Sequence, residues 1–176
     1  MVLMCQPLHD AVQEVERQDR RPARRILLTP QGERLTQERV EELATQERLL
    51  LIAGHYEGID ERVVDELAPL ELSAGDFVLS GGEIPAMLVV DAVVRLLPGA
   101  LGHDQSAAED SFAPRGPEGS RLLDCPHFTR PRTWQGRAVP DVLLSGDHEA
   151  VDEWRMEQML QRTRTRRPDL LENEDV

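Results

Sequence analysis

The 176-residue chain contains no lysine, only two cysteines and few aromatic residues, which make up 3% of the sequence. Cys5 and Cys125 are too few for a disulfide framework and indicate a reducing compartment. No apolar run reaches the length of a membrane span, and no basic stretch followed by a hydrophobic core opens the chain, so the sequence predicts neither a membrane protein nor a signal peptide. We therefore expect a cytoplasmic protein without a membrane partner.

Acidic residues dominate the charge, and the formal net charge of −13 argues against nucleic-acid binding. All 20 basic residues are nevertheless arginines, and they cluster within residues 17–25 and 162–167. An arginine-rich codon usage accounts for the missing lysine, but it does not account for the clustering. A local basic patch on an acidic protein can still hold phosphates.

Short apolar runs that end in glycine turns alternate with helical patterns, and 40% of the residues are apolar. The runs Leu49–Ala53 and Phe77–Leu79 predict buried strands, and Ile26–Leu28 predicts a short strand that ends in a turn at residues 29–32. Helices are predicted over residues 8–15, 36–44, 60–67, 83–97 and 145–167. The alternation predicts an α/β fold with a parallel sheet and helices on both faces.

Two glycine turns follow two of the predicted strands. Gly54 and Gly58 bracket a bend after the first, and Gly81 and Gly82 bracket a bend after the second. Because the carboxyl ends of parallel strands meet at one edge, we expect both turns to share a rim where bare backbone approaches a small ligand. Ordinary turns are the alternative interpretation of each glycine pair taken alone.

Seven phrases, in this order, closely resemble bacterial tRNA (guanine-37-N1)-methyltransferases over essentially the whole chain. They are residues 28–32, 54–62, 75–85, 98–102, 109–112, 122–131 and 142–146. The resemblance implies a SPOUT-type sheet with a deep trefoil knot, S-adenosylmethionine as methyl donor, a homodimer and stimulation by Mg²⁺. It also implies three parts: a knotted S-adenosylmethionine-binding methyltransferase domain (1–112), a flexible linker or lid (113–140) and part of a helical tRNA-binding domain (141–176).

The resemblance assigns three loops to the cofactor pocket. Its predicted residues are Leu28, Thr29, Pro30, Gly54, Tyr56, Glu57, Gly58, Ser73, Ala74, Gly75, Leu79, Gly81, Gly82 and Pro85. Glycine loops at strand ends supply the backbone donors and acceptors that an adenine ring needs beside apolar walls.

Two residues are catalytic by resemblance. Asp110 matches the family's general base, which takes the proton from N1 of guanine, and Arg95 matches an arginine that stabilises charge on guanine O6. The residues alone favour a solvated acid beside Glu109, and only the resemblance makes Asp110 a candidate base. Arg95 lies four residues after Asp91, where a helical ion pair is the alternative.

The resemblance also assigns a third group of residues to binding of the RNA substrate. The phrase around the target nucleotide contains Asp124, His127 and Arg130, and the last predicted helix carries Arg162, Arg164 and Arg166. A solvated amphipathic helix is the alternative for these last arginines. Cys125 and His127 are too few for a zinc site, and no motif locates the Mg²⁺, which carboxylates and water would hold.

The chain also departs from the family's pattern. It begins after the family's first strand and glycine-rich loop and ends before most of the C-terminal helices. His55 stands where the family usually has arginine, and residues 114–120 are extra. The predicted function is methyl transfer from S-adenosylmethionine to N1 of guanine 37 in tRNA. The alternative is a non-catalytic truncated remnant that binds the donor or dimerises without modifying tRNA.

Overall fold

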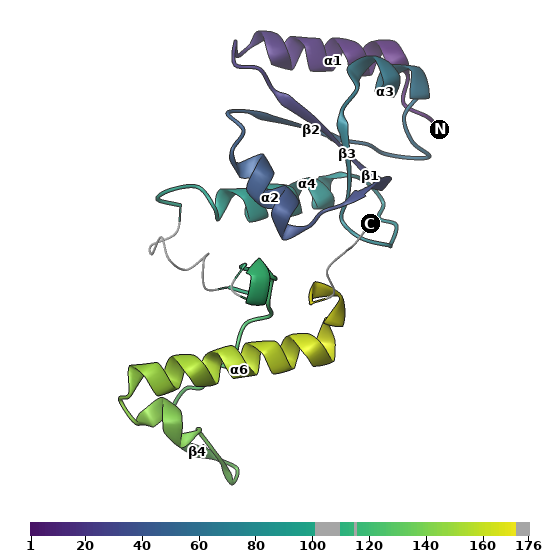
Figure 1. Ribbon diagram of the computed structural model, residues 1–176. Helices are drawn as coiled ribbons and strands as arrows, with labels where there is room; N and C mark the ends of the chain where they lie inside the picture. The colour runs from purple at the N-terminus through teal and green to yellow at the C-terminus, as the bar shows by residue number, and fades with distance from the viewer. Residues whose placement is uncertain (101–109, 115, 172–176) are drawn as a thin grey trace. The chain divides into compact units, whose positions relative to one another are not determined.

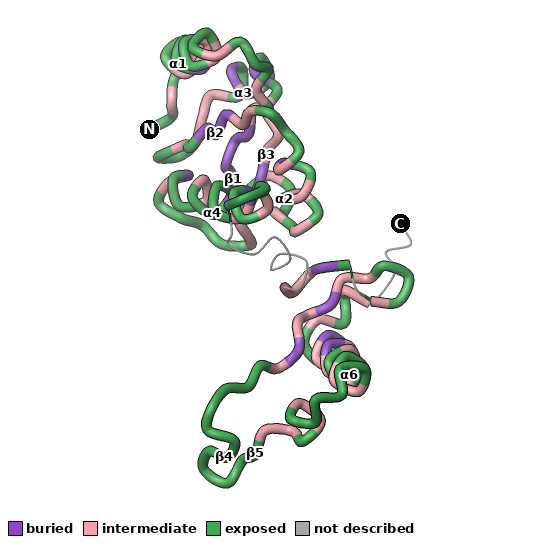
Figure 2. The backbone as a smooth tube through the Cα atoms, turned by 90° about the vertical axis from the view of Figure 1, so that its left-hand side faces the viewer, coloured by how far each residue is buried: buried purple, intermediate pink, exposed green. Residues whose placement is uncertain are grey.

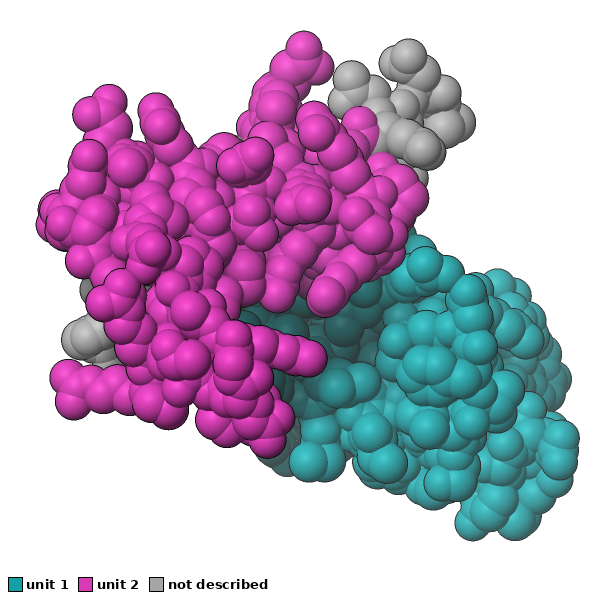
Figure 3. Space-filling model, turned by 90° about the horizontal axis from the view of Figure 1, so that it is seen from below, with its two compact units in different colours: residues 1–102 teal, residues 103–176 magenta. Residues whose placement is uncertain are grey.

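A computed structural model describes residues 1–100, 110–114 and 116–171. Gly102, Glu109 and Arg115, which belong to segments discussed above, lie outside these residues. The chain divides into two compact units, residues 1–102 and 103–176, which Figure 3 colours separately. Each unit is described by itself. In the described part of the chain, every helix is too short or too polar to cross a bilayer.

The first unit is built on a parallel sheet of three strands, β1 (Arg24–Arg34), β2 (Leu49–Ala53) and β3 (Leu70–Ser73). The strand order is β2-β1-β3, and β1 pairs in parallel with both neighbours. In this register Ile26 lies opposite Leu51 on one side and Leu70 on the other. The predicted α/β fold with a parallel sheet is confirmed.

Helices cover both faces of the sheet (Figure 1). On one face lie α1 (Cys5–Arg17) and α3 (Glu61–Leu67), and on the other lie α2 (Gln37–Ala44) and α4 (Glu83–Val94). Two helix starts follow capping chemistry, because the side chain of Thr36 accepts from the N–H of Arg39 and that of Asp60 from the N–H of Arg62. The predicted helices are confirmed, although α4 ends at Val94 rather than at residue 97.

Two apolar cores lie on the two faces of the sheet, and Figure 2 shows the buried residues along its strands. Because side chains alternate along a strand, Ile26 and Leu28 face one core and Leu27 faces the other. The core beneath α2 and α4 contains Ile26, Leu28, Val40, Leu43, Leu72, Val89 and Val93. The core beneath α1 and α3 contains Val12, Leu27, Leu50, Ile52, Val63 and Leu67.

The predicted strand at Phe77–Leu79 is wrong. These residues form an exposed loop, in which Val78 is 82% exposed, and the third strand is Leu70–Ser73 instead. The true strand is short and has Glu71 between two leucines, so it lacks a continuous apolar run. Pairing with β1 makes it a strand, and that long-range contact is invisible in the local pattern.

The predicted turn at residues 29–32 is an irregularity inside a longer strand rather than the end of β1. Leu28 and Glu33 both align with Leu72, so the four residues between them bulge out of the ladder. Gly32 permits the return to the ladder, because a Cβ atom there would lie 2.4 Å from the backbone carbon of Glu71. The bulge places residues 29–32 at the carboxyl edge of the sheet.

The N-terminal residues pair with the chain that follows β2. The N–H of Leu3 donates to the carbonyl of Gly58 at 3.0 Å, and the N–H of Asp60 donates to the carbonyl of Leu3 at 3.1 Å. The N–H of Glu57 also donates to the carbonyl of Met1 at 3.1 Å. Residues 1–3 therefore brace the loop between β2 and α3.

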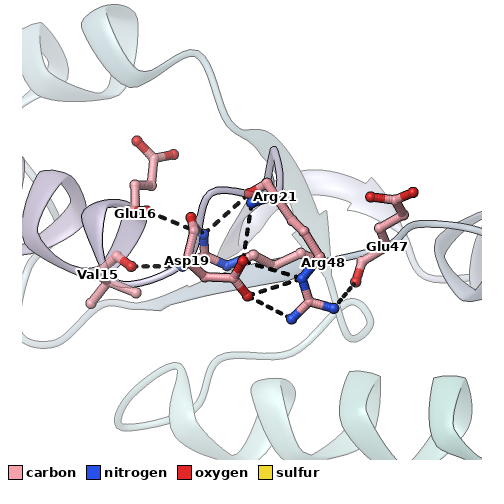
Figure 4. A network of polar contacts seen from close by, with 6 residues as sticks. All are labelled: Val15, Glu16, Asp19, Arg21, Glu47 and Arg48. Atoms are coloured by element: carbon pink, nitrogen blue, oxygen red, sulfur yellow. Dashed lines mark hydrogen bonds and ion pairs between the residues drawn. The ribbon is translucent and has the colours of Figure 1, made fainter.

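Arginines near the end of α1 make internal contacts rather than a free basic patch (Figure 4). The guanidinium of Arg48 donates to the carbonyls of Val15 and Asp19, each at 2.6 Å. Arg21 forms an ion pair with Asp19, and the Arg21 guanidinium holds the pKa of that carboxyl down at about 2. This network caps the C-terminal carbonyls of α1 and ties them to the start of β2.

The second unit is organised by α6 (His148–Arg166), which ends before Pro168, as predicted. It begins after its N-cap Asp147 rather than at residue 145. A small hairpin of β4 (Thr133–Trp134) and β5 (Arg137–Ala138) precedes it. Three short 3₁₀ turns cover residues 117–119, 141–144 and 168–170. Leu122, Cys125 and Met159 form the buried core of this unit.

Candidate functional site

A cavity of about 420 Å³ lies in the first unit, lined by the bulge of β1 and by the loops that follow β2 and β3. These segments meet at the carboxyl edge of the parallel sheet, where open α/β folds bind ligands. Every residue predicted for the cofactor lines this one cavity. That they bind S-adenosylmethionine stays a prediction.

The two glycine turns meet at the rim of this cavity, as predicted. The N–H of Gly82 donates to the carbonyl of Gly54 at 2.9 Å, and His55 forms a backbone bridge with Gly81. A Cβ atom on Gly82 would lie 2.8 Å from the Cα of Ala53. Glycine is therefore required at position 82 because the two backbones approach each other closely.

Ser73, the last residue of β3, fixes the conformation of the loop that follows the strand. The hydroxyl of Ser73 donates to the carbonyl of Gly75 at 3.0 Å and accepts from the N–H of Gly75 at 3.2 Å. Gly75 has a φ of +149°, which a residue with a side chain rarely adopts. This conformation turns the chain so that Phe77 and Val78 line the cavity, while both side chains remain more than half exposed.

The cavity has an acidic lining, with side chains of Glu57, Glu61 and Glu71. His55 also lines the cavity, and its Nε2 contacts the carboxylate of Glu83, which lies outside the lining. The pKa of Glu83 lies below its ordinary value, first because its carboxylate accepts from its own backbone N–H at the start of α4 and then because of His55. The acidic lining suits a ligand that carries positive charge.

Sequence reasoning missed several residues of the lining. They are Leu27, Gln31, His55, Ile59, Glu61, Val64, Glu71, Leu72, Phe77, Val78 and Ser80. Most of them could have been predicted from their position within a strand or just after it. Phe77 and Val78 were hidden by their interpretation as a strand.

In the second unit, hydrogen bonds gather several predicted substrate residues. The N–H of Asp124 donates at 3.0 Å to the hydroxyl of Ser111, which follows Asp110. The carboxylate of Asp124 lies 2.8 Å from Nε2 of His127, and Arg162 donates to the carbonyl of Asp124 at 3.4 Å. The segment of Asp110 is thus tied to Asp124, His127 and Arg162.

Other predicted residues lie elsewhere. Arg95 is the C-cap of α4 in the first unit and lines a shallow surface depression, not the cavity. Arg164 and Arg166 are exposed in the last turn of α6, and Arg130 lines a separate pocket of the second unit. Within the first unit, Arg95 thus lies outside the cavity of the predicted cofactor residues, and within the second unit Arg130 lines a pocket that contains neither Arg164 nor Arg166.

Asp124, Cys125 and His127 form a cluster whose potential ligand atoms all lie within 4.8 Å of one another. Both carboxylate oxygens of Asp124 are engaged, one with the N–H of Cys125 and the other with His127. Burial raises the pKa of the Cys125 thiol, which opposes the thiolate form that binds metals. A single carboxylate beside a thiol and an imidazole does not fit Mg²⁺, so no step below depends on that ion.

Comparisons with known proteins agree with these observations. The family model described as tRNA (Guanine-1)-methyltransferase TrmD matches residues 1–173. The chain is 55% identical over 176 residues to the tRNA (guanine-N(1)-)-methyltransferase of Halorhodospira halophila (strain DSM 244 / SL1), covering all of this chain and 64% of that protein. It is 51% identical over 176 residues to the proteins of the same name from Bacillus cereus (strain G9842) and Bacillus anthracis (strain A0248), covering all of this chain and 70% of each.

The chain thus spans less than two thirds of the length of the Halorhodospira halophila relative. The match to the family nevertheless includes both units and all the loops that line the cavity. On the evidence of this match, the chain belongs to the tRNA (Guanine-1)-methyltransferase TrmD family.

Proposed function

We propose that this chain forms the core of an enzyme that transfers a methyl group from S-adenosylmethionine to N1 of guanine 37 in tRNA. One observation carries the proposal: three loops far apart in the sequence converge on a single cavity at the carboxyl edge of the sheet. The family match and the names of the relatives supply the reaction class.

The cavity suits S-adenosylmethionine in size and chemistry. Its volume of about 420 Å³ lies in the usual range for small-molecule sites. The glycine loops line the cavity beside the apolar side chains of Leu79 and Pro85, and an adenine ring needs such apolar walls. Glu57 and Glu61 supply negative charge for the donor's amino and sulfonium groups. When bound, this cofactor supplies an electrophilic methyl group.

The chain's own residues would align the two reactants and move one proton. The carboxylate of Asp110 would accept the N1 proton of the guanine when N1 takes the methyl group that S-adenosylmethionine would supply. Arg95 stabilises negative charge that develops on guanine O6. Most of the rate gain comes from holding methyl and N1 in line at short distance.

We extend the proposal to a homodimer, because α4 presents an apolar face that nothing in the described part of its own unit covers. Its exposed side chains are Ile84, Met87, Leu88, Val90 and Val94. A second copy of the chain is the occupant that the family resemblance implies. The trefoil knot, the cytoplasmic location and tRNA binding by residues 141–176 belong to the same proposal.

The test uses the full chain in two assays, calorimetry with S-adenosylmethionine and methylation of a tRNA that carries guanine 37. We expect Asp110→Asn to keep the affinity for S-adenosylmethionine and to lose about 10²–10⁴-fold in methylation rate, the usual contribution of a general base. Asp65→Asn is the control, because Asp65 is an exposed carboxylate on α3 outside the cavity lining.

The possible results separate the alternatives. Methylation by Asp110→Asn at the rate of the unaltered chain would defeat the assignment of Asp110. Binding of S-adenosylmethionine without methylation by the unaltered chain would favour the non-catalytic remnant. Failure to bind S-adenosylmethionine would overturn the proposed function of the cavity.

A further inference from the structure

A second cavity, of about 550 Å³, lies wholly within the second unit. The segment Cys125–Arg132, the 3₁₀ turn Asp141–Leu144 and the first turns of α6 form its walls. From this lining, His127 and Arg130 belong to the predicted surroundings of the target nucleotide, and Trp154 and Arg155 lie in the segment 141–176 for which tRNA binding is proposed. Its volume lies within the range of about 300–1,000 Å³ of small-molecule sites.

The walls of this cavity are aromatic and aliphatic. The rings of Phe128 and Trp154 lie 6.2 Å apart between centroids and are tilted by 54°. Phe128 is 47% exposed and Leu144 is 48% exposed, so the apolar wall is open to solvent. Val139 and Val151 complete the apolar lining. Such a wall suits a flat apolar ligand surface.

Arginines surround this apolar wall although the whole chain is acidic. Arg130, Arg132 and Arg155 line the cavity and are exposed. Arg132 pairs with Asp141 at 2.8 Å, and Arg155 pairs with Asp152 at 3.4 Å. Exposed pairs of this kind contribute only about 0–1 kcal/mol, so these guanidinium groups can exchange a carboxylate for a phosphate, which accepts the same bidentate pair of hydrogen bonds.

We propose that this cavity binds one unstacked nucleotide of the RNA substrate, with its base against Phe128 and Trp154 and its phosphate on the surrounding arginines. The inference rests on the proposed function, which supplies an RNA. Single-stranded loops offer bases that stack on aromatic side chains, and the negative phosphate complements the local positive charge.

The chain itself supplies a spectroscopic probe of this cavity. It contains two tryptophans, so in the Trp134→Phe variant Trp154 is the single tryptophan. We expect an RNA hairpin with the anticodon-loop sequence of a tRNA carrying guanine 37 to quench Trp154 fluorescence in that variant. Stacking of a base on the indole ring causes the quenching.

Substitutions give the second measurement, the affinity for the same RNA hairpin. We expect Phe128→Ala to weaken RNA binding about tenfold and Phe128→Tyr to restore it, because base stacking on an aromatic ring contributes about 1–3 kcal/mol. We expect Arg132→Gln to weaken binding and to reduce the slope of log affinity against log salt by about 1. Affinity for S-adenosylmethionine remains unchanged in all three variants.

Trp134→Leu is the matched control, since Trp134 is an exposed aromatic residue on β4 that does not line the cavity. It keeps the RNA affinity of the unaltered chain. The inference is overturned if RNA binds without quenching Trp154, or if Phe128→Ala binds RNA as tightly as the unaltered chain. In either case, methylation by the unaltered chain would still support the proposed function.

Two other results would also support or overturn the proposed nucleotide site. Quenching and weakened binding by Phe128→Ala without any methylation would support this cavity while the catalytic proposal fails. A Trp154 signal that changes with protein concentration in the absence of RNA would identify a second copy of the chain as the occupant and overturn the inference.

Discussion

The backbone N–H of Leu123 donates to the side-chain hydroxyl of Thr163 at 2.9 Å, across 40 positions of sequence. The same hydroxyl donates to the carbonyl of Met159 at 2.7 Å, and Thr163 is fully buried. This one side chain therefore attaches the segment that carries Asp124 and His127 to α6. The geometry of both the substrate cluster and the second cavity depends on that attachment.

Thr163→Val tests this attachment. We expect the variant to destabilise the second unit by about 1–3 kcal/mol, because the buried N–H of Leu123 loses its acceptor. Urea unfolding followed by tryptophan fluorescence measures the effect, since both tryptophans lie in this unit. Thr165→Val is the control, because Thr165 also bonds to a carbonyl one turn earlier but is exposed. Equal effects of the two substitutions would contradict the prediction.

Gly82→Ala tests the close approach of the two turns at the rim of the first cavity. The added methyl group would lie 2.8 Å from the Cα of Ala53, so we expect a loss of about 1–3 kcal/mol in stability and weaker binding of S-adenosylmethionine. Calorimetric unfolding and calorimetric titration measure the two effects. Gly54→Ala is the control, because its methyl group would contact only the side chain of Ile59, at 3.5 Å. We expect this variant to keep the melting temperature of the unaltered chain. An unaltered melting temperature for Gly82→Ala would count against this account.

Arg48→Met tests the network at the end of α1. Methionine keeps the apolar stem but leaves the carbonyls of Val15 and Asp19 without their charged donor, so we expect a loss of about 1.5–3 kcal/mol. Arg17→Met serves as the comparison, because its ion pair with Glu14 is exposed on both sides and contributes about 0–1 kcal/mol. Urea unfolding followed by circular dichroism separates the two outcomes, and similar midpoints for both variants would refute the prediction.

Acid should weaken the same network through Asp19. Its pKa is about 2 in the folded chain, below the ordinary value of 3.8, because Arg21 donates to the carboxylate. The unfolded chain therefore binds the proton more readily, and the contribution of Asp19 is complete above pH 3.8 and is lost as the pH falls through 2. We expect Asp19→Asn to reduce the dependence of the urea midpoint on pH below 5. Identical pH profiles for Asp19→Asn and the unaltered chain would exclude this role.

The sequence predicted those parts of the fold that have local causes. Thr36 and Asp60 are capping residues, and the helices they precede begin where expected. Leu49–Ala53 is a continuous apolar run, and it forms a strand. β3 was missed because its pairing with β1, rather than its own pattern, makes it a strand.

In the candidate site, too, the sequence predicted the features with local causes and missed those that depend on long-range contacts. Glycines after predicted strands indicated a shared rim, and the bond between Gly82 and Gly54 places them together. The role of Asp110 came only from the family resemblance, because an aspartate in a polar segment has no distinguishing local pattern. The pocket of Phe128 and Trp154 depends on contacts between residues 26 positions apart, which no periodicity reveals.

The backbone pairing of Met1 and Leu3 with residues 57–60 has a practical consequence for handling this protein. Disruption of this pairing would remove the support of one wall of the first cavity while leaving both apolar cores intact. Samples in which residues 1–3 are displaced would then show the same melting curve but unequal ligand occupancy. Amide hydrogen exchange at residues 57–60 should therefore accompany every binding measurement.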